Sequence, residues 1–192
     1  MQGFKRGPLA AAVFGLSGAF SVIAPAADYQ IDPAHSFVEF KIQHLGYSWM
    51  FGRFDNVSGS FSYDSAKPAA SSIQVEVDAK SINTNHAERD KHLRSKDFLE
   101  VDKFTKASFK STAFKGSGDK GVLSGVLSFH GVDKPIEVMV DKVGEGKDPW
   151  GGYRAGFVGT YTMTRADFGL NYELGPSSTT AQLTFGIEGI KK

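Results

Sequence analysis

The clearest β-strand signal in this chain is Ile73-Gln74-Val75-Glu76-Val77-Asp78-Ala79-Lys80, in which apolar and polar side chains alternate throughout. A period of two predicts a strand that turns one face to the interior and the other to water. The same alternation recurs on both sides, and turn residues such as Lys67-Pro68 separate the segments. These further segments are 38–43, 57–63, 107–115, 122–130, 136–143, 154–164 and 181–190. The sequence therefore predicts an all-β chain.

The number of strands indicates how their edges are hidden. About eight antiparallel strands joined by short connections would leave exposed edges in an open sheet. Closure into an up-and-down barrel removes these edges, and a barrel of about eight strands holds side chains or one small ligand. A β-sandwich is the competing architecture. No repeat or linker divides the chain, which predicts a single domain.

A charged segment interrupts the strand pattern between Asn83 and Leu99. It predicts a short helix near residues 85–99, the one helical insert in an otherwise β chain. Asn85 is the expected N-cap, and Glu88 follows three residues later in an approximate capping box.

The first 26 residues are interpreted as a cleaved export signal, which leaves residues 27–192 as the mature barrel domain. Lys5 and Arg6 form the basic start, and an apolar stretch leads to the small-residue cleavage pattern Ala24-Pro25-Ala26. The apolar stretch is shorter than the roughly 18 residues of a membrane-spanning helix. We therefore expect secretion without stable membrane insertion.

The charge balance and the absence of cysteine limit the partners and ligands that this chain is expected to have. Removing Lys5 and Arg6 from the 22 basic residues leaves 20, against 21 acidic ones, so the mature chain carries a formal charge of −1. A nearly neutral chain is not expected to bind nucleic acid, which favours a strongly basic face. The chain has no cysteine, and it therefore has neither disulfides nor thiolate ligands.

The sequence indicates no catalytic residue, metal site or cofactor. It has no Gly-x-Ser-x-Gly nucleophile motif. On a helix, His86 pairs with Asp90 and Glu88 pairs with His92, each one turn apart. The two pairs are offset by two residues and point about 200° apart, so their side chains do not converge on one ion.

The inward-facing positions of the predicted strands are mostly bulky and apolar. Such residues fill a close-packed core by default, but the walls of a ligand channel have the same composition. The sequence leaves both interpretations open at this point. The inward positions are Phe40, Ile42, Phe61, Val75, Val77, Phe109, Leu127, Phe129, Val138, Phe157, Tyr161, Leu183, Phe185 and Ile187.

Several stretches of this chain resemble the YceI family of secreted bacterial proteins. These stretches are residues 27–32, 35–49, 84–99, 131–135, 148–157 and 167–170. The resemblance implies a lipocalin-like antiparallel barrel with a long hydrophobic channel that binds polyisoprenoids or related amphiphilic lipids. It also implies a periplasmic location, and it supplies no catalytic motif.

With this resemblance, the sequence is interpreted as a periplasmic carrier that holds an isoprenoid or similar long-chain lipid in its barrel. The inward residues would line the ligand tail. Two alternatives stay open: an enzyme that uses His86 or His92 as a base on a lipid or small polar substrate, and a stress-related interaction protein with a filled barrel. A homodimer is also left open.

Charged and aromatic residues in the predicted loops are candidates for the mouth of the barrel and the lipid headgroup. Arginine suits a phosphate because its planar fork donates paired hydrogen bonds. The competing interpretation is that the arginines only pair with Glu88, Asp90 and Asp97 and fix the insert to the barrel. The mouth candidates are Trp49, Arg89, His92, Arg94, Trp150 and Arg154.

Overall fold

The computed structural model describes residues 26–117 and 119–192. The predicted signal peptide, residues 1–26, lies outside the described residues except for its last residue. The strands are β1 (Ala27–Ile31), β2 (Phe37–His44), β3 (Ser48–Phe54), β4 (Val57–Tyr63), β5 (Ser72–Asp78), β6 (Ile82–Asn83), β7 (Lys106–Ser117), β8 (Lys120–Phe129), β9 (Val132–Lys147), β10 (Tyr153–Thr164) and β11 (Thr180–Lys191). The helix α1 spans Ala87–Arg94, and four 3-10 turns are η1 (Pro68–Ala70), η2 (Ala79–Ser81), η3 (Arg165–Phe168) and η4 (Pro176–Ser178).

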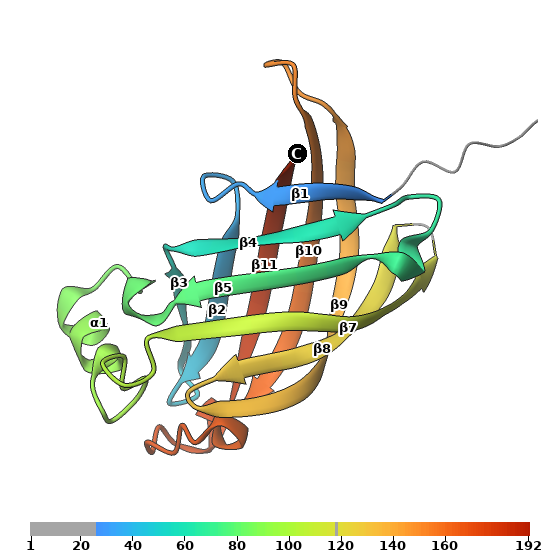
Figure 1. Cartoon of the computed structure of the whole chain (residues 1–192). Coiled ribbons are helices and arrows are strands. Elements are labelled where there is room, and N and C mark those ends of the chain that lie inside the picture. Colours follow the sequence, from blue (N-terminus) through green and yellow to red (C-terminus); the bar gives the residue numbers. More distant parts are fainter. Residues whose placement is uncertain (1–25, 118) are drawn as a thin grey trace, which may run out of the picture.

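The strands close into an antiparallel barrel (Figure 1). Hydrogen bonds connect β1, β4, β5, β7, β8, β9, β10 and β11 in that order, and β1 pairs again with β11 to complete the ring. The prediction of an eight-stranded all-β barrel is confirmed, and the sandwich alternative is wrong. Closure leaves no free edge among these strands.

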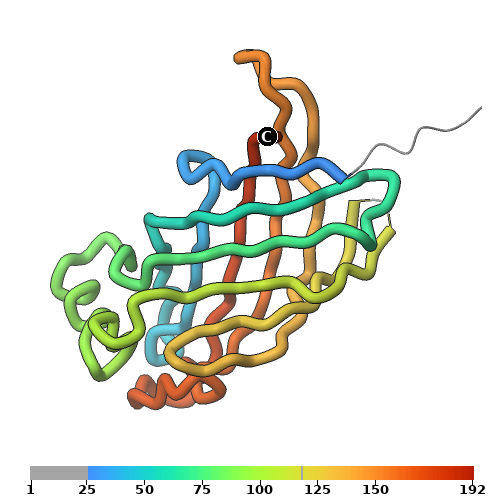
Figure 2. Tube along the Cα trace, in the orientation of Figure 1, coloured from blue at the N-terminus to red at the C-terminus, as the bar shows by residue number. Residues whose placement is uncertain are grey.

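The strand β11 has different partners along its two halves. Its last part pairs with β1, whereas residues 181–186 pair with β2. The strand β3 pairs with β2 and then with β6, which follows β5 after the turn η2. The sheet therefore continues around the lower part of the barrel through β2, β3 and β6 (Figure 2).

The helix is confirmed, but its predicted cap is wrong. His86 has the extended backbone of an N-cap, and its Nδ1 accepts a hydrogen bond from the Arg89 N–H at 3.3 Å. Asn85 instead has a φ of 59°, and its own N–H donates to the Asn83 side chain. This left-handed residue turns the chain one position before the cap, so Asn85 cannot cap the helix. None of the helices in the described chain has the length and apolar composition to cross a lipid bilayer.

Two clusters of buried apolar side chains form the interior. One includes Leu127, Ile136 and Met163 and lies toward α1, and the other includes Tyr29 and Phe61. Phe54 and Phe185 pack against both clusters. Many inward-facing side chains, including Phe109, Phe129 and Leu183, are only half-buried although they point away from bulk water. This exposure indicates an interior that its own side chains do not fill.

Candidate ligand cavity

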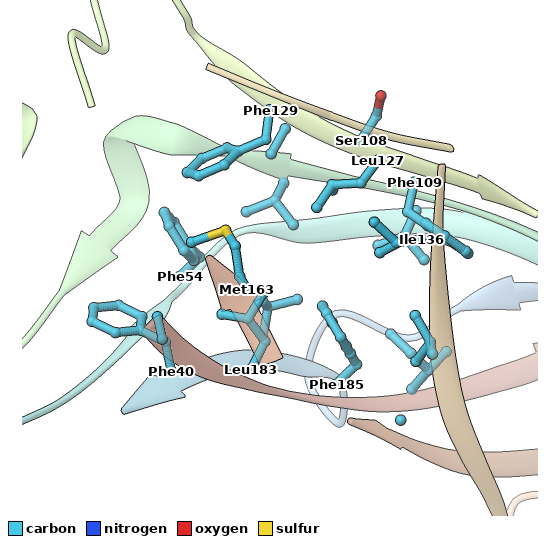
Figure 3. A pocket seen from close by; sticks show the side chains of 18 of the residues that line it. Phe40, Phe54, Ser108, Phe109, Leu127, Phe129, Ile136, Met163, Leu183 and Phe185 are labelled. Atoms are coloured by element: carbon cyan, nitrogen blue, oxygen red, sulfur yellow. The ribbon is translucent and has the colours of Figure 1, made fainter. Parts of the chain in front are cut away.

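A cavity of about 260 Å³ runs through the interior of the barrel. Its wall is built from inward-facing side chains of β2, β3, β4, β5, β7, β8, β9, β10 and β11, because alternate residues of a strand point to the same side. In Figure 3, Leu127 and Phe129 from β8 and Leu183 and Phe185 from β11 project into one space from different walls. The volume is just below the roughly 300–1,000 Å³ typical of small-molecule sites.

The structure places all but one of the predicted tail-lining residues on this wall. These residues are Phe40, Ile42, Phe61, Val75, Val77, Phe109, Leu127, Phe129, Val138, Phe157, Leu183, Phe185 and Ile187. Period-two alternation was sufficient to find them, since closure of the barrel turns every inward face toward the same space. Their contact with a lipid stays a prediction.

Tyr161 is the exception among these residues. Its side chain packs against the cluster that contains Met163 and is not on the cavity wall. Burial raises the pKa of Tyr161, and the nearby charges of Lys134 and Asp167 act in opposite directions on it. Tyr161 therefore contributes to the packed core near the end of β10.

The cavity wall offers few partners to water. Apart from Arg165, the side chains with polar atoms on the described wall are Ser62, Tyr63, Ser71, Ser72 and Ser108. A buried water typically needs two to four polar partners, and an apolar cavity stays dry without them. An apolar ligand tail would therefore enter a space that water occupies poorly.

Comparison with known sequences and folds agrees with this geometry. The model of the YceI-like domain matches residues 29–189. The chain belongs to the YceI family. A UPF0312 protein of Shewanella sp. (strain W3-18-1) is 50% identical over 188 residues, which cover 96% of this chain and 98% of the relative. A UPF0312 protein of Pseudomonas aeruginosa (strain LESB58) is 49% identical over 171 residues, with 88% and 90% coverage.

Solved structures of the YceI fold superimpose on most of this family member. The Campylobacter jejuni YceI protein matches with a TM-score of 0.70 and 25% identity, and the match covers 95% of this chain and 99% of the other. A Saccharophagus degradans domain, described as polyisoprenoid binding and implicated in plant cell wall breakdown, matches with a TM-score of 0.64. Its identity is 20%, with 85% and 98% coverage, so this likeness shows the fold.

The six predicted mouth residues of this YceI-family chain do not lie together. Arg154 pairs with Ile190 near one end of β11, whereas Trp49 pairs with Gln43 beside the opposite end. About ten residues of strand separate the two positions, or about 30 Å. We call the end that carries α1, η3 and η4 the helix end, and the end that carries the β9–β10 hairpin the hairpin end (Figure 1). Trp49 and the residues of α1 lie at the helix end, and Trp150 and Arg154 lie at the hairpin end.

Arg154 is held in a network of carboxylates. Its Nη1 donates to Asp32 and Glu188 at 2.6 Å each, and its Nε donates to Asp148 at 2.9 Å. The guanidinium also lies 5.4 Å from the centre of the Trp150 ring. These bonds join the β1–β2 turn, the β9–β10 hairpin and β11. The predicted headgroup role of Arg154 and Trp150 has no support from this arrangement, because the guanidinium is already paired and neither residue is on the cavity wall.

The same network accounts for a cluster of potential metal ligands. Ligand atoms of Asp32, His35 and Glu188 lie within 4.8 Å of one another. The Arg154 guanidinium donates to two of these residues, and the His35 ring bonds to Asp32 at 2.8 Å. The positive charge of Arg154 therefore already compensates the carboxylates of Asp32 and Glu188.

Asp32 gives this network a predicted pH dependence. The hydrogen bond from Arg154, followed by that from His35, lowers the pKa of Asp32 to about 2, while burial opposes the shift. The pKa in the unfolded chain is about 3.9. A lowered folded-state pKa stabilises the fold above pH ~4, and this contribution is lost as the pH falls from ~4 to ~2. Urea unfolding at several pH values should show this decrease in the free energy of unfolding.

The substitution Arg154→Gln should flatten the decrease, because the pKa of Asp32 then returns toward its unfolded value. The control is Arg53→Gln, which removes an exposed ion pair with Asp55. It should leave the acid dependence unchanged. An Arg154→Gln protein with the wild-type acid dependence would contradict the assignment to this network.

The arginines of the helical insert fix it to the barrel. Arg94 donates to the carbonyls of Lys80 and Ile82 at 2.8 and 2.6 Å. Arg89 donates to the hydroxyl and carbonyl of Thr84 at 2.7 and 2.6 Å. Neither arginine forms an ion pair within the described residues. The competing interpretation is therefore right that these arginines fix the insert, but it is wrong about their partners Glu88, Asp90 and Asp97. Contact of Arg89 and Arg94 with a headgroup stays a prediction.

Asp90 completes this attachment from the buried side of α1. Its Oδ1 accepts hydrogen bonds from both the N–H and the hydroxyl of Thr84. We expect Asp90→Ala to lower the free energy of unfolding by about 2 kcal/mol, because hydrogen bonds to a charged group contribute about 1.5–3 kcal/mol. Urea unfolding measures this change. The exposed neighbour Lys91→Ala is the control, and an equal loss in both variants would contradict the role given to Asp90.

The two histidines of the insert are engaged outside the cavity. His86 caps the helix, and the ring of His92 lies between Phe98 and Tyr172 with its Nε2 3.3 Å from Asp97. Neither histidine is on the cavity wall. Among the described residues, the wall includes no histidine, aspartate or glutamate. The two candidate bases of the enzyme alternative therefore lie away from the cavity wall.

Arg165 is the one charged residue on the described cavity wall, and it was not among the residues predicted from sequence. A signal was present in the sequence. Arg165 is an even number of residues away from the inward-facing Phe157 and Met163, which is the spacing of one face of a strand. It also follows β10 directly. A charged residue in the inward register of a strand is uncommon unless it has a specific partner.

Proposed function

We propose that this protein binds an isoprenoid or similar amphiphilic lipid and carries it in the periplasm without catalysis. The observation that supports this proposal is the apolar cavity, whose wall extends from Phe157 to Met163 along β10 alone, or about 20 Å of strand. A long apolar chain matches both the shape and the chemistry of this space. The cavity favours this proposal over the alternative of a filled barrel.

The energetics of tail burial favour such a ligand. Each methylene that moves from water into the cavity contributes about 0.8 kcal/mol. A dozen methylenes would give a gross gain of about 10 kcal/mol, enough to offset an association cost of several kcal/mol. Binding therefore needs no covalent step and no cofactor.

One structural neighbour supports the same ligand class. The Saccharophagus degradans domain that shares this fold is described as polyisoprenoid binding. Because the identity is low, the likeness supports an apolar ligand in this barrel and leaves the particular lipid open.

We place the ligand entrance at the helix end. There, Leu93, Phe98 and Leu174 contribute to the cavity wall from α1, from the segment that follows it and from the segment before η4. The neighbouring β2–β3 turn exposes Leu45 and Tyr47, the latter at 88%. Exposed apolar residues around an opening are typical of a surface that receives a ligand or partner.

Native mass spectrometry of protein released gently from the periplasm tests the proposal. We expect a bound mass that matches an isoprenoid lipid, or uptake of geranylgeraniol by delipidated protein. A protein that stays empty after this incubation would contradict lipid carriage. Turnover of the bound lipid that His86→Ala or His92→Ala abolishes would instead establish the enzyme alternative.

Export is part of the proposal and has its own test. We expect the protein recovered by osmotic shock to begin at Ala27, because the Ala24-Pro25-Ala26 pattern precedes that residue. N-terminal sequencing of the periplasmic fraction measures this directly. An uncleaved chain that remains in the cytoplasmic fraction would contradict the periplasmic role. A homodimer stays a prediction.

A further inference from the structure

Arg165 is a buried cation at the helix end of the cavity. It begins η3, directly after the last residue of β10, and is only 8% exposed. It belongs to the cavity wall together with Leu170 and Leu174. A guanidinium in such apolar surroundings is costly unless its charge is compensated.

The protein itself compensates this charge only in part. Nη1 donates to the Ser178 carbonyl at 2.9 Å, and Nη2 donates to the Tyr172 carbonyl at 2.6 Å. A guanidinium has five N–H donors, so three have no acceptor among the described residues. No carboxylate of the described chain forms an ion pair with Arg165, whereas Arg154 has three such partners.

The electrostatics of Arg165 agree with an unmatched cation. Burial lowers the pKa of its guanidinium, and only the charge of Glu173 raises it. Glu173 is exposed, and its Oε1 accepts a hydrogen bond from the Gly175 N–H at 2.6 Å. An arginine nonetheless stays protonated near neutral pH. The two carbonyl bonds hold the planar group in place, so an incoming anion would meet a preorganised donor.

We propose that Arg165 binds the anionic headgroup, a phosphate or carboxylate, of the lipid whose tail occupies the cavity. This inference rests on the proposed lipid-binding function. The planar fork of arginine matches two oxygens of such a group, and the apolar surroundings strengthen the interaction. The headgroup would then lie at the helix end beside Tyr172, with the tail directed toward Phe185 and Phe61.

Binding of farnesyl phosphate and of farnesol to the mature protein tests this inference, because the two ligands share one tail. We expect the wild-type protein to prefer the phosphate by about tenfold or more. Arg165→Met should abolish this preference and retain farnesol binding, and Arg165→Lys should keep part of it. The control Arg53→Met, which removes an exposed arginine of the outer surface, should leave the preference unchanged.

The outcomes separate this inference from the function on which it rests. Equal wild-type affinity for both ligands would overturn the role of Arg165 and leave lipid carriage intact. Failure to bind either ligand would overturn both. Inorganic phosphate alone should not compete at concentrations similar to those of the lipid, and strong competition would identify a free-anion site instead. The wild-type comparison decides the question even when Arg165→Met fails to fold.

Discussion

Leu183→Trp should lower the affinity for geranylgeraniol about 10- to 50-fold. Leu183 projects into the cavity from β11 and is half-buried there (Figure 3). The larger indole would occupy space that the tail needs, and each displaced methylene removes about 0.8 kcal/mol of binding free energy. Displacement of two or three methylenes gives the stated range. Binding of tritiated geranylgeraniol to delipidated protein measures the effect.

The neighbouring Gln182 supplies a matched control, because its side chain is exposed on the outer face of the same strand. Gln182→Trp adds the same ring outside the barrel and should leave the affinity unchanged. Equal losses in the two variants would contradict tail binding in the cavity. Circular dichroism should show a folded barrel in both, since the indole of Leu183→Trp enters existing space.

Phe185→Ala should lower the free energy of unfolding and strengthen the preference for the longer of two isoprenoid alcohols. Phe185 packs against both interior clusters, so its removal takes contacts from each. We expect the ligand-free protein to lose about 2–3 kcal/mol of unfolding free energy, less than the 3–5 kcal/mol typical of a fully buried phenylalanine. The enlarged cavity should favour geranylgeraniol over the shorter farnesol more strongly than the wild type does. Urea unfolding and competition binding measure the two effects.

Phe37 provides the comparison for this variant, because it covers Gly186 from the outer side of β2. Phe37→Ala removes a ring of the same size without changing the cavity. It should leave the preference between the two alcohols at its wild-type value. A Phe185→Ala protein with unchanged preference would show that the tail does not reach this part of the interior.

The barrel and most of its inner wall were predictable from sequence because both depend on period-two alternation. Residues such as Val75, Phe109 and Phe185 share the inward register, and closure directs them to one space. Alternation does not say whether that space is filled. The half-buried state of Phe109 and Leu183 appears only once all the walls are placed together.

The mouth of the barrel could not be predicted in the same way. Trp49 and Trp150 both follow turn signals, but the strand register puts them at opposite ends. Arg154 is a residue type that suits an anion site. In the fold, however, the carboxylates of Asp32, Asp148 and Glu188 already accept its hydrogen bonds. Arg165 lies one residue beyond the predicted strand 154–164, and its lack of a carboxylate partner is a property of the folded chain alone.

A crystal structure of residues 27–192 grown with geranylgeraniol addresses the cavity most directly. We predict continuous density for the isoprenoid tail inside the barrel, in contact with Phe40, Leu127 and Phe185. Tail density confined to the outer surface, or an interior that side chains close completely in the presence of the lipid, would contradict the proposed carrier function.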